Sequence, residues 1–93
     1  MARTKTIVLD GEEYQLQSVT YRWYVNIIDL YLNPNNGRRD TAKYTDLLIK
    51  GCVTSPIEVA NKGLQYFEER DDIKTPGELA KEIETFLGER VKS

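Results

Sequence analysis

Residues 5–32 read KTIVLDGEEYQLQSVTYRWYVNIIDLYL, and this stretch decides the fold class. Asp10 and Gly11 tolerate the positive φ angles of a tight two-residue turn, so the sequence predicts a β-hairpin over residues 5–17. Because side chains alternate along a strand, one face of this hairpin is predicted to be apolar. That face carries Ile7, Leu9, Tyr14 and Leu16.

The predicted helix over residues 20–32 is unusually apolar. At 100° per residue its apolar positions cover an arc of roughly 220°, whereas a surface helix needs little more than 100°. Only Arg22, Asn26 and Asp29 form a polar strip. Such a helix must be covered on two sides, by the chain itself or by a partner. The sequence therefore favours a protein–protein contact as the function.

Two lines of side chains on this helix are predicted to have different roles. The line through Trp23, Ile27 and Leu30 is predicted to face the core. Aromatic residues are enriched at interfaces, because a rigid ring buries a large area at low entropic cost. The candidate partner-binding residues lie on the flank of the helix: Tyr21, Tyr24, Ile28 and Leu32. For the two tyrosines of this flank, the sequence leaves core and interface equally open.

Further helices are predicted after a loop over residues 32–40, where Asn, Pro and Gly cluster. They span residues 41–52, 56–70 and 76–88. The first has Asp40 or Thr41 as its N-cap. The other two begin with capping boxes in which Pro holds the first helical position, Ser55-Pro56-Ile57-Glu58 and Thr75-Pro76-Gly77-Glu78.

The apolar stripes of the last two predicted helices indicate which faces are buried. The stripe of the helix over 56–70 consists of Ile57, Ala60, Leu64 and Phe67, and that of the helix over 76–88 consists of Leu79, Ala80, Ile83, Phe86 and Leu87. The prediction is a single α+β domain over residues 1–93, mainly helical, with an N-terminal β-hairpin followed by three or four helices. The two ends of the chain are predicted to be flexible.

The composition argues against two classes of partner. The net charge of −2 arises from 13 basic and 15 acidic residues mixed along the chain, so the basic stripe of a nucleic-acid-binding protein is missing. The longest apolar run falls short of the about 20 residues that cross a bilayer. Cys52 is the only cysteine and can form no intrachain disulfide, which suits a reducing cytoplasm.

The sequence offers little for catalysis. It contains no histidine, which removes the commonest general base and the commonest metal ligand. Cys52 lacks a histidine to activate it and is predicted to be a small core residue. The acidic pairs lie in polar runs, and neither a calcium loop nor a phosphate-binding Gly-rich loop is present. We therefore expect no enzymatic activity, no cofactor and no metal.

The order of these elements resembles the tail assembly chaperones of long-tailed bacteriophages and prophages. The resemblance is carried by the hairpin TIVLDGEEYQLQ, the aromatic-rich helix after it, the helix KYTDLLIKGCV and the following Ser-Pro break. It covers residues 5 to 60 and, more loosely, the C-terminal helix. No single part is distinctive, and the order and spacing of the parts carry the resemblance.

This resemblance implies a function in assembly. Members of the family bind the long, largely helical tape-measure protein, keep it soluble and help tail-tube subunits polymerise around it. The short form of the family would match 93 residues; a longer form often arises by ribosomal frameshifting. The resemblance also implies a homo-oligomer in the cytoplasm of the bacterial host that is absent from the mature virion.

Two other classes of function remain open from the sequence. A structural tail component, such as a completion or head–tail joining protein, would have a similar size but would stay in the virion. A small helical DNA-binding regulator would retard DNA in a salt-dependent way. The acidic balance of the chain argues against the regulator.

Overall fold

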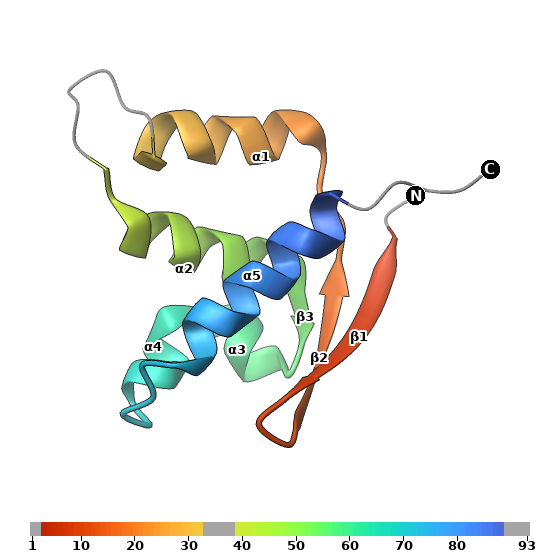
Figure 1. The fold of residues 1–93 in the computed structure, drawn as a ribbon, viewed down its shortest axis with the longest axis vertical. Coiled ribbons are helices and arrows are strands. Elements are labelled where there is room, and N and C mark those ends of the chain that lie inside the picture. Colours follow the sequence, from red (N-terminus) through yellow and green to blue (C-terminus); the bar gives the residue numbers. More distant parts are fainter. Residues whose placement is uncertain (1–2, 33–38, 89–93) are drawn as a thin grey trace.

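The computed structural model describes residues 3–32 and 39–88, and it begins with a β-hairpin (Figure 1). Strands β1 (Thr4–Leu9) and β2 (Glu12–Gln17) pair antiparallel. Both turn residues have positive φ angles, 52° at Asp10 and 78° at Gly11, as a tight hairpin turn requires. The predicted α+β, mainly helical class is confirmed. Both predicted flexible ends, at 1–2 and 89–93, and residues 33–38 of the predicted loop lie outside the described residues.

A third strand, β3 (Val53–Ser55), pairs antiparallel with β2 and completes a sheet of order β1-β2-β3. The sequence does not predict this strand, because three residues are too few to show an alternating pattern. The strand also overturns the predicted capping box at Ser55. Ser55 pairs with Gln15 in the sheet, and Pro56 precedes the next helix without a side-chain cap hydrogen bond.

The first long helical segment has two parts. Helix α1 (Tyr21–Ile27) continues into a π-helical turn, η1 (Ile28–Leu32), so that together they span nearly the whole predicted helix over 20–32. The Thr20 hydroxyl caps α1 by accepting a hydrogen bond from the Trp23 N–H at 3.2 Å.

Helix α2 (Thr41–Cys52) has the bounds that the sequence predicts. Its N-cap is Asp40, one of the two predicted alternatives. The Asp40 carboxylate accepts a hydrogen bond from the Lys43 N–H at 3.0 Å.

The predicted continuous helix over residues 56–70 is wrong. It consists of two short helices, α3 (Ile57–Lys62) and α4 (Leu64–Glu68), separated by Gly63 at φ 59° and ψ −128°. The break has a clear physical cause in α2. The carboxylate of Asp46 accepts a hydrogen bond from the Leu64 N–H at 2.9 Å, and so caps α4 from a neighbouring helix.

The buried side chains of this region differ in part from the predicted stripe. Val59 and Tyr66 enter the core together with the predicted Phe67, whereas Ile57, which the continuous stripe placed inside, is 66% exposed. A periodic stripe keeps its direction only along an unbroken helix. The positive φ at Gly63 reorients α4 relative to α3, and the predicted stripe is only partly right: Phe67 is buried, Ala60 and Leu64 are half-buried, and Ile57 is exposed.

Helix α5 (Thr75–Gly88) is the last helix of the described chain. Its N-terminus is capped by Asp72 and not by the predicted capping box at Thr75. The carboxylate of Asp72 accepts hydrogen bonds from the N–H groups of Lys74 and Thr75, at 3.1 and 3.0 Å. Hydrogen bonds from Thr75 lower the pKa of the Asp72 carboxyl, which keeps the capping group ionised. Thr75 itself is buried.

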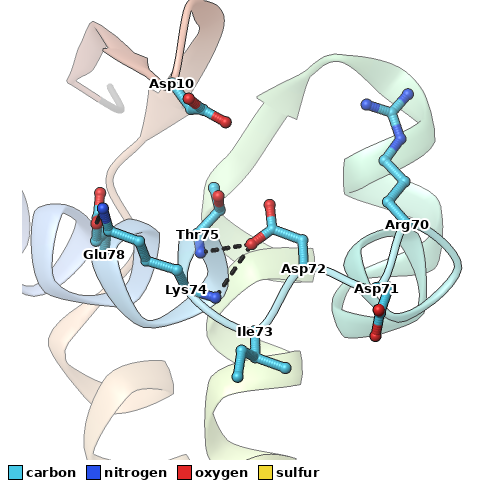
Figure 2. A pocket seen from close by; sticks show the side chains of 8 residues that line it. All are labelled: Asp10, Arg70, Asp71, Asp72, Ile73, Lys74, Thr75 and Glu78. Carbon is cyan, nitrogen blue, oxygen red and sulfur yellow. Dashed lines mark hydrogen bonds and ion pairs between the residues drawn. The ribbon is translucent and has the colours of Figure 1, made fainter.

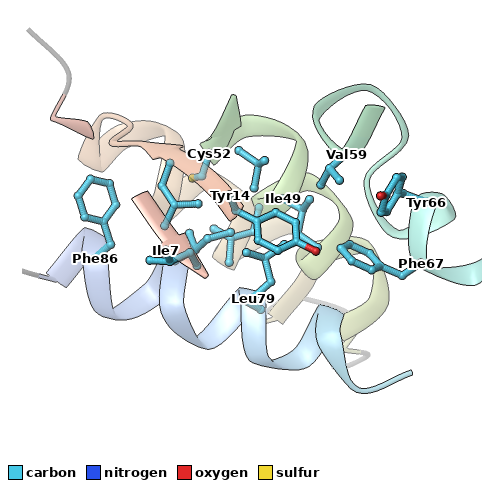
Figure 3. Packing of buried hydrophobic residues seen from close by; sticks show 14 of the residues in the cluster. Ile7, Tyr14, Ile49, Cys52, Val59, Tyr66, Phe67, Leu79 and Phe86 are labelled. Carbon is cyan, nitrogen blue, oxygen red and sulfur yellow. The ribbon is translucent and has the colours of Figure 1, made fainter. Parts of the chain in front are cut away.

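The core lies where the inner face of the hairpin meets α2 and α5 (Figure 3). Tyr14 packs near Phe67, with ring centroids 6.5 Å apart, and Phe67 makes an edge-to-face contact with Tyr66 at 5.2 Å. Most of the predicted inner faces of the hairpin and of α5 are buried, and the two residues at their margins, Leu9 and Leu87, are half-buried.

We expect Gly63→Ala to lower the free energy of unfolding by about 1–3 kcal/mol, because a side chain would be strained in this backbone conformation. The added Cβ would also overlap the Asp46 Oδ1 atom that caps α4. Urea unfolding followed by circular dichroism measures the change. The matched control is Gly77→Ala in α5, where a Cβ meets nothing within 4 Å. Equal effects of the two substitutions would contradict the strain at Gly63.

Candidate functional site

The candidate site is built on α1 and η1, which cross one end of the molecule above α2 (Figure 1). Ile27 is the only buried residue in this helical segment. The sequence predicts a helix that needs cover on two sides, and all of its apolar side chains except Tyr21 and Leu30 are at least half-buried. The placement of α1 on α2 therefore determines which apolar side chains are left for a partner.

The ring of Trp23 in α1 packs on the backbone of Gly51 in α2. A Cβ atom at position 51 would lie 2.5 Å from Cζ2 and 2.7 Å from Cη2 of the ring, so glycine is needed for this approach. The side-chain amide of Gln17 donates a hydrogen bond to the Gly51 carbonyl at 3.2 Å. The end of β2 and the start of α1 are thus both anchored at the same turn of α2.

A hydrogen-bonded cluster of three polar side chains also connects α1 to the rest of the molecule: Tyr24, Tyr44 and Glu84. The hydroxyl of Tyr44 in α2 donates to the Glu84 carboxylate of α5 at 2.9 Å and lies 3.4 Å from the Tyr24 hydroxyl. Burial, together with these hydrogen bonds, raises the pKa of Tyr44 far above its ordinary value. Tyr44 therefore stays protonated at neutral pH and links three helices.

The four predicted partner-binding residues fall into two groups. Tyr21 is 82% exposed, whereas Tyr24, Ile28 and Leu32 are half-buried and pack against the core. These three side chains thus help to pack the helix against the core, and each is still partly accessible to solvent. Whether any of the four contacts a partner stays a prediction.

The predicted core line of the helix is only partly right. Ile27 is buried and Trp23 is half-buried, but Leu30 is 64% exposed. A π-helical turn bonds residue i to i+5 and is wider than an α-turn, so residues after Ile28 leave the direction that a period of 3.6 assigns them. The exposed apolar residues of this segment are therefore Tyr21 at its start and Leu30 near its end.

A hollow of about 390 Å³ lies beside the start of α1. Its lining comprises Val19, Thr20, Tyr21, Tyr24, Glu84, Leu87 and Gly88. The fold thus joins Tyr21 and Tyr24 with the far end of α5, while Ile28 and Leu32 lie outside the hollow. Sequence reasoning missed the contribution of Leu87 to this site, although its position at the margin of an amphipathic stripe was the available signal.

A larger hollow, of about 620 Å³, lies between the hairpin turn and the segment that leads into α5 (Figure 2). Its acidic groups do not converge: the carboxylates of Asp10, Asp71 and Glu78 stand apart, and Asp72 is turned to its backbone partners. Among residues 3–32 and 39–88, no group of three or more Cys, Asp or Glu side chains is placed to hold a metal ion.

The charged stretch after α4 is tied to the hairpin by one carboxylate. Glu12 accepts hydrogen bonds from the hydroxyls of Tyr14 and Tyr66, at 3.3 and 3.0 Å. The guanidinium of Arg70 lies 3.8 Å from the same carboxylate and 4.2 Å from the centre of the Tyr66 ring. These groups satisfy one another, so they stabilise the fold and leave no unpaired group for chemistry.

Cys52 lies fully buried, and the prediction of a small core residue is confirmed. Burial raises the pKa of its thiol to about 12, so the group stays protonated at neutral pH. Across the described part of the chain, no helix is long and apolar enough to cross a bilayer. No protein-family model, curated protein or solved structure matches this chain.

We expect Gly51→Ala to destabilise the protein, because the about 1–3 kcal/mol cost of displacing the Trp23 ring exceeds the about 1 kcal/mol gained in helix propensity. Trp23 is the only tryptophan, so its fluorescence reports the displacement directly. In a Trp23→Leu background the same substitution should be nearly neutral. An equal loss of stability in both backgrounds, measured by urea unfolding, would show that the ring does not depend on Gly51.

Proposed function

We propose that this chain is a tail assembly chaperone that binds the tape-measure protein, keeps it soluble and promotes tail-tube assembly, without catalytic activity. The observation that carries the proposal is the exposure of two large apolar residues on α1 and η1. Tyr21 and Leu30 lie at opposite margins of the exposed side of this segment, and Tyr21 borders a hollow that Val19, Tyr24 and Leu87 also line. The resemblance of residues 5 to 60 to that family supports the same conclusion.

The free face suits an amphipathic helix of the client. Binding of a helix in a groove relies on a few apolar anchors spaced by one or two turns. One such anchor would enter the hollow beside Tyr21. Leu30 lies nine residues further on, at the opposite margin of the exposed side, and would contact a different segment of the client. Between these two residues the exposed side chains are polar, which limits the affinity and suits a client that must later be released into the tail.

The proposal includes where and with what the chain acts. It acts in the cytoplasm of the bacterial host, binds no nucleic acid and no membrane, and is absent from the mature virion. Its partners are the tape-measure protein and, during assembly, the tail-tube protein and a longer frameshifted form. Self-association into a homo-oligomer is also part of this proposal.

The direct test is co-expression with the long helical tape-measure protein, followed by affinity capture and gel filtration. We expect the client to be soluble and to co-elute with the wild-type chain. The double substitution of Tyr21→Asp with Leu30→Asp should reduce the soluble client to the level found without this chain. Both side chains are exposed, so the circular dichroism and thermal unfolding of the variant should stay close to those of the wild type.

The matched control is Ile73→Asp, because Ile73 is 94% exposed but lies on the segment before α5, away from α1. This variant should keep the client soluble. The proposal fails if the wild-type chain does not alter the solubility of the client, or if the control and the double variant behave alike. Recovery of the chain from purified virions by mass spectrometry would instead favour the structural tail component.

A further inference from the structure

The two edges of the sheet differ in their ability to pair with another strand. The β3 edge is blunt, since this strand has three residues, an irregular register opposite Gln15 and Leu16, and Pro56 directly after it. The β1 edge is six residues long, contains no proline and pairs with β2 in an unbroken register. An open edge of this kind is a template for a further strand.

The register shows which backbone groups of β1 face outward. Ser18 donates a hydrogen bond to the Arg3 carbonyl at 2.9 Å, so this pair is of the hydrogen-bonded type. Because the two types alternate along an antiparallel pair, the N–H and C=O groups of the even-numbered residues point away from β2. These residues are Thr4, Thr6 and Val8. Within the described chain, no hydrogen bond joins their outward backbone groups to another residue.

We propose that this edge is a self-association site, at which β1 of a second copy pairs antiparallel with β1. The two-fold axis of the dimer passes between the two Thr6 residues. Thr6 then lies opposite Thr6 of the second copy, and Thr4 lies opposite Val8 of the second copy. All the outward backbone groups of these three residues find reciprocal partners, and the two sheets join into one. A two-fold contact of this kind is closed, so it makes dimers rather than open chains.

The charges along the hairpin favour a second copy in this orientation. Arg3 and Lys5 make the start of β1 basic, whereas the turn end is acidic through Asp10, Glu12 and Glu13. Antiparallel pairing places the basic end of each copy beside the acidic end of the other, and a parallel arrangement would place like charges together. The outer face adds no conflict, because it pairs threonine with threonine and threonine with the 63% exposed Val8.

The size of the edge sets the strength of the contact. A strand of six residues is about 20 Å long, so the pairing alone buries less than the about 1,200 Å² of a standard interface. The dimer should therefore be weak and should dissociate on dilution. This inference gives a surface to the self-association that is part of the proposed function. It is argued from β1 alone, so client binding through α1 and dimerisation through β1 can fail separately.

Sedimentation velocity over a range of protein concentrations at low salt tests the proposed register with two matched pairs of substitutions. Thr4→Lys with Val8→Lys places like charges opposite each other in both halves of the dimer and should raise its dissociation constant at least about tenfold. Thr4→Glu with Val8→Lys places opposite charges there and should restore or tighten the dimer. Within one strand the two positions are four residues apart and too distant to pair, so the effect is specific to the dimer.

Thr6→Pro gives an independent measurement, because it removes an N–H that points away from β2 and should abolish the dimer. Thr6→Val keeps the N–H and should dimerise like the wild type. Far-UV circular dichroism verifies that each variant is folded, and the charged pairs decide the question if the proline variant is not. The proposal is overturned if the wild type is monomeric at about 1 mM, or if both charged pairs associate equally well.

Discussion

The contact of the Trp23 ring with the backbone of Gly51 is the constraint on which the outer surface of this protein depends. It fixes α1 against the last turn of α2 at a distance that no other residue at position 51 allows. With this side of the helix held, Ile27 turns into the core and Tyr21 is left in solvent. Most of the wide apolar arc of the helix is thus used for packing inside the molecule, and Tyr21 and Leu30 remain exposed at its two margins.

The sequence was sufficient to predict the parts of the fold that local physical chemistry determines. The positive φ angles at Asp10 and Gly11 define the hairpin, and the N-cap of α2 and the apolar stripe of α5 are local signals as well. The break at Gly63 could not be predicted, because its cause is a hydrogen bond from Leu64 to Asp46, a residue of another helix. Strand β3 likewise forms only because β2 offers it an edge.

The candidate site was predicted about as far as a helical period allows. Tyr21 and Tyr24 border the hollow, as their helical positions allow. Leu30 is exposed because of a π-turn for which the sequence contains no recognisable signal. The remaining lining comes from Val19 and Thr20 and from α5, which is more than fifty residues away along the chain. The two proposed surfaces, the face of α1 and the edge of β1, are joined through the hairpin, since β2 leads directly into α1. One small domain could thereby bind its client and pair with its own copy at separate places.

Hydrogen–deuterium exchange with mass spectrometry, with and without the tape-measure protein, tests the central claim most directly. If the client covers the free face of α1 and η1, the amides of residues 21–32 should exchange at least about tenfold more slowly in the complex. The amides of α3 and α4 should be unaffected. Protection confined to those two helices, or none at residues 21–32 although the two proteins bind, would contradict the proposed binding face.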